Sequence, residues 1–115
     1  MKRLGVIGGT GLINMTVGEE MEQSGLRLIR RDDVTVETPW GDVPLTCMTL
    51  SSGDEEKELF FLQRHHNGDQ ASKPPHKIEH RANMRALFDA GCEAVMAVCS
   101  VGAIPSDFPP GKVGL

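Results

Sequence analysis

The chain has 115 residues, of which 39% are hydrophobic and 24% charged, and its formal net charge is −4. This length fits a single domain over residues 1–115, and the composition is that of a globular chain, not of a disordered chain or a coiled coil. Acidic and basic residues are interspersed, which argues against nucleic-acid binding, and no apolar run is long enough to span a membrane.

Cysteine usage and the N-terminus favour a cytoplasmic protein. The sequence carries three cysteines, an odd number, and none of them forms a C-x-x-C pair. Neither a disulfide framework nor a thiolate zinc site is therefore indicated. The first residues lead into a glycine turn instead of the long apolar segment of a secretory signal. We expect a reduced, unexported chain.

The first predicted element is a buried strand over 3–7, which delivers the glycine-rich turn Gly8-Gly9-Thr10-Gly11. The following region, 12–25, has no clear periodicity and predicts at most one helical turn, over 19–23. Segments with alternating or β-branched residues, separated by turn residues, then predict antiparallel hairpins. These strands are expected over 26–30, 34–38 and 43–50, with a polar hairpin loop over 51–57.

The second half of the chain predicts two more strands and one helix. The most apolar strand, 59–62, leads directly into Arg64 and His65. Helical spacing of apolar residues, followed by Gly91 as a helix-ending residue, predicts a helix over 78–90. A further buried strand over 94–98 ends in Cys99 and Ser100, and the tail 105–114 predicts no element. The apolar residues of the helix pattern are Met84, Leu87 and Phe88.

Buried strands that end in small-residue turns, with hairpins between them, predict an α/β fold with a mixed β-sheet and flanking helices. In such sheets ligands gather at the C-terminal ends of parallel strands. The turns at 8–11, 64–65 and 99–100 are therefore the candidate sites.

The glycine turn is a candidate phosphate cradle. Glycines let backbone N–H groups approach an anion, and the hydroxyl of Thr10 can add a hydrogen bond. A tight turn without a ligand is an equally good interpretation of this motif alone. The dinucleotide pattern G-x-G-x-x-G fails because its third glycine is replaced by Asn14, and the P-loop pattern fails because no lysine follows the turn.

Arg64 and His65 have the chemistry to complement Thr10. An arginine at the mouth of a buried strand can donate two parallel hydrogen bonds to a phosphate, and an adjacent histidine can donate another. Taken alone, such residues at a strand end are more often ordinary surface residues. Cys99 and Ser100 suggest a nucleophile, but no base is assignable, and their backbone amides are better candidates for contacting an anion or a sugar.

A different interpretation comes from 76–80, which reads H-x-x-E-H. In inverted zinc metallopeptidases two histidines at this spacing bind zinc while the glutamate assists water. Here His76 follows Pro74-Pro75 and is expected at or before the helix start, where this geometry is unreliable. We therefore predict no metal site, and the zinc hydrolase stays a minor alternative.

Five short motifs together resemble one family in their order and spacing, the methylthioadenosine/methylthioinosine phosphorylase branch of the purine nucleoside phosphorylases. The resemblance runs over 6–111. Its Pro-Pro-His and Val-Gly-Ala-Ile pieces look closer to the methylthioinosine and 6-oxopurine type. The motifs are 6–12 (VIGGTGL), 38–41 (TPWG), 62–65 (LQRH), 74–83 (PPHKIEHRAN) and 97–104 (AVCSVGAI).

The resemblance implies a partial purine nucleoside phosphorylase-like fold and phosphorolysis of a purine nucleoside in purine salvage. The expected substrate is 5′-methylthioinosine or 5′-methylthioadenosine, the expected products are the free base and (methylthio)ribose 1-phosphate, and the expected assembly is a homotrimer. Phosphate would be bound by Thr10, Arg64 and His65, and the turn at Cys99 and Ser100 would contact phosphate and ribose. Inorganic phosphate is the co-substrate, and no metal or organic cofactor is expected.

The sequence also departs from the family. His66 stands where many members have glycine, the loop over 67–73 is longer, and Cys99-Ser100 replaces Thr-Ala. The chain looks like an N-terminal portion that ends before the purine-recognising segments, so we expect catalysis to be incomplete at this length. The alternative is a non-catalytic, truncated module that binds an anion or forms oligomers. The sequence leaves open which residues act on the nucleoside, whether the purine is 6-amino or 6-oxo, and whether the 5′ group is methylthio or hydroxyl.

Overall fold

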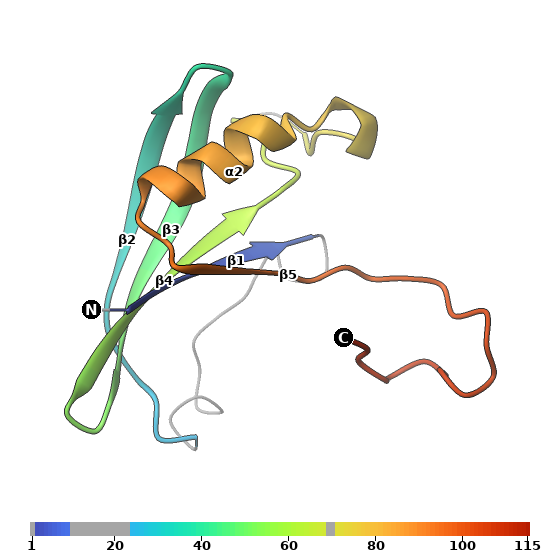
Figure 1. The fold of residues 1–115 in the computed structure, drawn as a ribbon. Coiled ribbons are helices and arrows are strands. Elements are labelled where there is room, and N and C mark those ends of the chain that lie inside the picture. Colours follow the sequence, from blue (N-terminus) through green and yellow to red (C-terminus); the bar gives the residue numbers. More distant parts are fainter. Residues whose placement is uncertain (1, 10–23, 69–70) are drawn as a thin grey trace.

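The computed structural model describes residues 2–9, 24–68 and 71–115. Within these ranges it contains a five-stranded mixed sheet in the order β2-β3-β4-β1-β5, with one α-helix, α2, across one face (Figure 1). The α/β class with a mixed sheet is therefore confirmed. The elements are β1 (Lys2–Gly8), β2 (Arg27–Thr38), β3 (Gly41–Ser52), β4 (Glu55–Gln63), the short 3-10 helix η2 (Pro75–Lys77), α2 (His80–Asp89) and β5 (Ala94–Ala97).

Strands β2, β3 and β4 form an antiparallel meander. The strands predicted over 26–30 and 34–38 are one continuous strand, β2, with a register irregularity between Leu28 and Arg30. The polar residues between the two predicted segments stay in the strand because β2 lies at the edge of the sheet, where its side chains are largely exposed. The predicted loop over 51–57 contracts to a tight turn at Gly53, whose φ of 62° suits a glycine, and the polar residues after it pair with β3.

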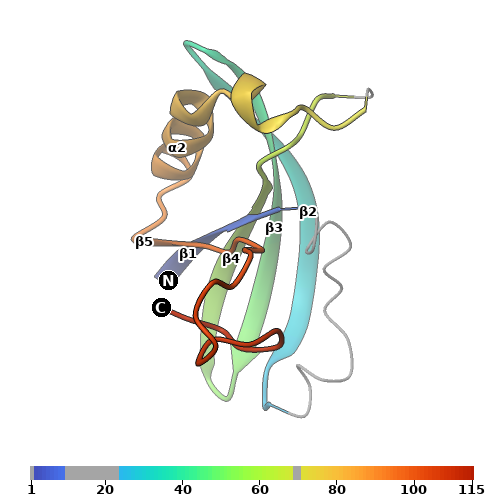
Figure 2. The ribbon, with the colours of Figure 1, turned by 90° about the vertical axis from the view of Figure 1, so that its right-hand side faces the viewer.

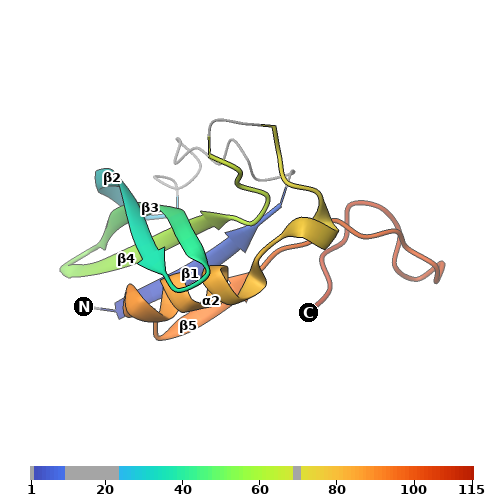
Figure 3. The ribbon, with the colours of Figure 1, turned by 90° about the horizontal axis from the view of Figure 1, so that it is seen from above.

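Strands β1, β4 and β5 run parallel to one another, with β1 in the middle. Their C-terminal ends therefore meet at one edge of the sheet. The predicted burial of the last strand is wrong, because all four residues of β5 are exposed. In the described part of the chain β5 is the outermost strand of the sheet, and its apolar sequence alone could not reveal this position. After β5 the chain forms no regular element and runs away from the sheet (Figure 3).

The predicted helix is present as α2 and ends as expected. Cys92 N donates to Leu87 O at 3.1 Å and Gly91 N donates to Phe88 O at 2.9 Å, with Gly91 at φ 83°. This bond pair is the Schellman arrangement, which glycine favours at this position. The buried face of α2 differs from the predicted one, since Met84 is 49% exposed and Phe88 76% exposed. The buried residues are Ala82, Asn83, Ala86 and Leu87.

Ala82, Ala86 and Leu87 of α2 belong to one buried cluster with residues of β3 and β4, and the helix lies along one face of the sheet (Figure 2). A Cβ on Gly5 of β1 would lie 3.2 Å from Cδ2 of Leu87, so a larger residue there would press against the helix. The phenylalanines 60 and 61 are buried on opposite faces of β4. Trp40 lies in the β2–β3 turn and is 43% exposed.

Candidate phosphate site at the ends of three parallel strands

The candidate site lies where β1, β4 and β5 end. Gly8 pairs with Gln63, Ile7 pairs with Ala97, and Val98 N donates to Ile7 O at 2.9 Å. The residues that follow these strands, including Arg64 and Cys99, thus belong to the same edge. Thr10 lies outside the described residues, so its predicted role stays a prediction.

Arg64 joins the three strand ends. Its backbone N donates to Gly8 O at 3.1 Å, and its guanidinium Nη1 donates to Val98 O at 2.9 Å. The guanidinium crosses the end of β1 directly over Gly9, where a Cβ would come within 2.7 Å of Cζ of Arg64. Gly9 is therefore needed for the close approach of a side chain rather than for a positive φ.

Within the described residues, the charge of Arg64 has no acidic partner. No carboxylate of the described residues forms an ion pair with it, and its one side-chain acceptor is a neutral carbonyl. Its remaining guanidinium N–H groups are oriented in a fixed plane and are available to an anion. An anion bound here would supply the missing countercharge.

The surrounding segment is basic within an acidic chain. Residues 64–81 contain all four histidines together with two arginines and two lysines, against two acidic residues. One of those acids, Glu79, is already engaged, because Arg81 donates to both of its carboxylate oxygens at 2.9 and 3.2 Å. This hydrogen bonding lowers the pKa of Glu79 and raises that of Arg81. The segment that carries Arg64 and His65 therefore has an excess of basic residues, which favours an anion.

His65 is held by two hydrogen bonds. Its backbone N donates to Oε1 of Gln63 at 3.0 Å, and its ring Nδ1 lies 2.9 Å from Lys73 O. A carbonyl only accepts, so Nδ1 must carry the hydrogen. In the neutral ring Nε2 is then an acceptor, and His65 can donate to an anion through Nε2 only as the imidazolium. Lys73 N donates back to His65 O at 2.8 Å, which closes the loop between the two residues.

Two residues next to this pair were not predicted. The ring Nε2 of His66 lies 2.7 Å from Oδ1 of Asn83 in α2, and Asn83 is 3% exposed. The side-chain Nε2 of Gln63 is buried and has no hydrogen-bond partner among the described residues. The polar residue Asn83, which lies beside Ala82 in the helix, is the feature of the sequence that could have indicated the contact with His66. No sequence pattern indicated the buried side chain of Gln63.

The side chains of Cys99 and Ser100 do not join Arg64 and His65. Both residues are exposed, and within the described ranges the hydrogen bond from Arg64 reaches the backbone of Val98 instead. Their predicted contact with phosphate and ribose stays a prediction.

The H-x-x-E-H residues are not arranged as a metal site. His76 lies in η2, Glu79 is the N-cap residue of α2 and bonds Arg81, and His80 begins the helix. The described residues include no group of three or more His, Cys, Asp or Glu side chains that could hold a metal ion. The same ranges include no helix that is long and apolar enough to cross a membrane.

A separate cavity of about 400 Å³ lies at the opposite ends of the same three strands. Its lining includes Lys2, Leu4, Lys57 and Ala94, near the starts of β1, β4 and β5. It does not include Arg64 or His65, so it is not the candidate phosphate site.

The chain is similar in sequence to several curated nucleoside phosphorylases. The 6-oxopurine nucleoside phosphorylase of Pyrococcus furiosus is 36% identical over 111 residues, which are 96% of this chain and 36% of that protein. The probable S-methyl-5′-thioinosine phosphorylase of Methanocaldococcus jannaschii is 33% identical, over 94% of this chain and 35% of the relative. The S-methyl-5′-thioadenosine phosphorylase of Pyrococcus furiosus is 31% identical, over 98% of this chain and 38% of the relative.

The chain is a homologue of the purine nucleoside and methylthionucleoside phosphorylases over part of their length. The resemblance found in the five motifs is thereby confirmed. No family model matches the chain. The chain spans little more than a third of the length of the curated phosphorylases it matches.

Solved phosphorylase structures share the fold. A methylthioadenosine phosphorylase from Schistosoma mansoni in complex with adenine superposes with a TM-score of 0.58, at 27% identity, over 96% of this chain and 32% of that one. A methylthioadenosine phosphorylase from an Antarctic soil metagenomic library has a TM-score of 0.57 at 24% identity, over 84% of this chain and 29% of that one. At this identity the similarity shows the fold alone. The sheet and helix described here therefore form a partial phosphorylase-like α/β fold.

Proposed function

We propose that this chain supplies the phosphate-binding part of a site for the phosphorolysis of a purine nucleoside. The observation that carries the proposal is the guanidinium of Arg64, which the carbonyl of Val98 holds over Gly9 and which pairs with no carboxylate of the described residues. Similarity to proteins named as nucleoside phosphorylases gives the reaction class. Thr10 and His65, with the backbone of the turn at Cys99 and Ser100, complete the proposed phosphate contacts.

The proposed chemistry needs position and charge more than it needs acid or base catalysis. Phosphate attacks the anomeric carbon of the nucleoside while the bond to the purine nitrogen breaks, through an oxocarbenium-like state. The protein then has to hold an anion beside a developing cation. Arg64 fixes the orientation of the phosphate, and its anchors on β1 and β5 keep the guanidinium from moving during the reaction. The reaction so written requires neither a metal ion nor an organic cofactor.

The finer assignments are proposals as well. The substrate is proposed to be 5′-methylthioinosine or 5′-methylthioadenosine, because the similar proteins bear both kinds of name. The products would be the free purine and 5-methylthioribose 1-phosphate, and the setting would be purine salvage in the cytoplasm. A homotrimer is the proposed assembly.

A panel of three nucleosides tests the function. The protein is incubated with 5′-methylthioinosine, 5′-methylthioadenosine or inosine, with and without inorganic phosphate, and base release is followed by chromatography. We expect release that requires phosphate for at least one of them. Absence of cleavage for all three, together with absence of phosphate binding by calorimetry, would contradict the proposal.

The same measurements separate a second candidate function, a non-catalytic anion-binding module. The observation that favours this candidate is that the contacts described here, those of Arg64, concern an anion and not a nucleoside. Phosphate binding without cleavage of any of the three nucleosides would support it over the enzyme.

A further inference from the structure

We propose that His66 is a positioning residue, which ties the turn carrying Arg64 and His65 to helix α2 through the buried Asn83. This inference rests on the proposed function for its role in phosphate binding. The bond itself, 2.7 Å between Nε2 of His66 and Oδ1 of Asn83, does not depend on that function.

The turn is attached to a different part of the fold through each of three consecutive residues. Arg64 bonds the ends of β1 and β5. His65 bonds Lys73 across the loop, at both its ring and its backbone. His66 bonds α2. Removing the third attachment would leave the turn held to the sheet and to its own loop, but not to the helix.

Asn83 makes this third attachment strong. It is the buried polar residue of the described core, 3% exposed among Ala82, Ala86 and Leu87. A buried amide oxygen that loses its donor costs roughly 1–3 kcal/mol. The helix therefore favours the arrangement in which the His66 ring reaches it, and the packing of α2 on the sheet fixes where that ring must be.

The position of His66 is transmitted to the anion-binding groups over a short path. Backbone N of His66 donates to Gln63 O at 3.1 Å, so residues 63–66 form one tight turn with Arg64 and His65 at its centre. A displacement of about 1 Å in such groups can cost on the order of 100-fold in rate.

Four variants of the chain test the anchor. His66→Gly removes the donor, and His66→Gln restores a side-chain N–H of similar reach. Asn83→Leu removes the acceptor while keeping the volume, and Asn83→Asp keeps the acceptor oxygen. If a glycine or leucine variant does not fold, the glutamine and aspartate variants still report on the bond.

Two readouts are needed, and one of them is independent of any ligand. The first is hydrogen exchange of the Arg64 and Lys73 backbone amides, and the second is the affinity for inorganic phosphate by calorimetry. In His66→Gly and Asn83→Leu we expect both amides to exchange about tenfold faster and phosphate to bind about tenfold more weakly. His66→Gln and Asn83→Asp should stay within about threefold of the parent chain in amide exchange, which is the difference expected for a retained bond.

The outcomes distinguish the anchor from the proposed function. Two results would overturn the anchor. One is an unchanged exchange rate of the Arg64 amide in folded His66→Gly and Asn83→Leu. The other is that His66→Gln and Asn83→Asp exchange this amide as fast as His66→Gly and Asn83→Leu do. Faster exchange with unchanged phosphate affinity would show that the bond is only structural and would also overturn the positioning role. If the parent chain binds no phosphate, the proposed function fails, and the positioning role fails with it.

Discussion

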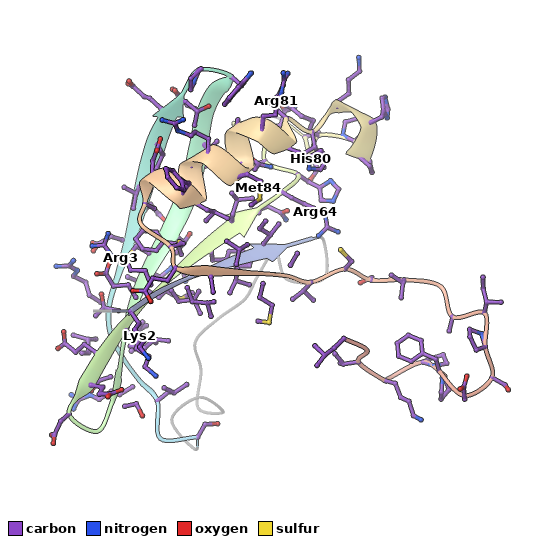
Figure 4. All side chains as sticks on the ribbon, in the orientation of Figure 1. Lys2, Arg3, Arg64, His80, Arg81 and Met84 are labelled. Atoms are coloured by element: carbon purple, nitrogen blue, oxygen red, sulfur yellow. The ribbon has the colours of Figure 1, made fainter. Side chains whose placement is uncertain are left out.

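Two arginines at opposite ends of the same strands serve different purposes (Figure 4). Arg3, near the start of β1, donates to Ala90 O at 2.8 Å, approaches Glu58 at 3.5 Å and lies over the ring of Phe60. Arg64, after β4, has a neutral carbonyl as its side-chain acceptor and no described carboxylate nearby. The charge of Arg3 is paired within the fold, whereas that of Arg64 is held in place without an acidic partner in the described part of the chain.

The difference teaches how a binding cation can be told from a structural one. Arg3 stabilises the C-terminus of α2, where carbonyl groups attract positive charge, and Glu58 supplies its countercharge. The guanidinium of Arg64 is held by a neutral carbonyl, and under the proposed function its charge would act on a bound anion. Its partners, more than its exposure or residue type, distinguish it from Arg3.

The largest expected effect comes from Arg64→Ala. Loss of a charge-assisted pair should weaken binding of inorganic phosphate on the order of 10- to 100-fold. Arg64→Lys should recover only part of this, because a lysine lacks the planar arrangement of donors. Calorimetric titration with phosphate measures the effect, and an affinity within twofold of the parent chain would contradict the role given to Arg64.

A smaller effect on the same site is expected from Gly9→Ala. The new Cβ would displace the guanidinium of Arg64, and phosphate affinity should fall about tenfold, the equivalent of one lost hydrogen bond. Gly5→Ala is the matched control on the same strand, with a Cβ contact of 3.2 Å to Leu87. That control should lose about 1–2 kcal/mol of stability through crowding and leave phosphate affinity unchanged. Equal phosphate affinity in the two variants would break the comparison.

Arg3→Ala should show the opposite profile to Arg64→Ala. The side chain of Arg3 is 43% exposed, so solvent screening limits the contribution of its ion pair. We expect a loss of about 1 kcal/mol in the free energy of unfolding, largely from the helix C-terminus. Urea denaturation measures it. Phosphate affinity should be unaffected, and a weakening comparable to that in Arg64→Ala would refute the division between the two arginines.

The smallest effect is a dependence of stability on alkaline pH. Burial, with a hydrogen bond to Glu58, raises the pKa of Cys47 from 9.0 to about 11. The unfolded chain therefore releases this proton at lower pH than the folded chain does, and stability present below pH 9 is lost progressively towards pH 11. The variant Cys47→Ala should lose less stability over this interval than the parent chain. Parallel curves of unfolding free energy against pH would rule this out.

The sequence was sufficient to predict the layout of the site. Apolar runs that end in small or polar residues located the strand ends, and Gly91 located the end of the helix. From these features the convergence of 8–9 with 64–65 at one edge of the sheet could be inferred. The approach of Arg64 to Gly9 could not, because it depends on the path of a long side chain across a neighbouring strand.

The errors concern burial and long-range side-chain contacts. Val95 and Met96 in β5 have the sequence of a buried strand, but burial depends on what packs against a strand and not on its own residues. Met84 and Phe88 indicated the helix correctly but not its buried face. The residues of α2 that pack against β3 and β4 are Ala82, Ala86 and Leu87. The pairing of His66 with Asn83 joins residues 17 apart in sequence, with a loop and a helix start between them.

The two hydrogen bonds that join His65 to Lys73 have an evolutionary consequence. Both use the backbone of Lys73, whose carbonyl accepts from the ring of His65 and whose N–H donates to His65 O. Most side chains at position 73 would therefore leave the orientation of the His65 ring unchanged. The charge beside the strand ends can thus vary at this position while the ring stays in place.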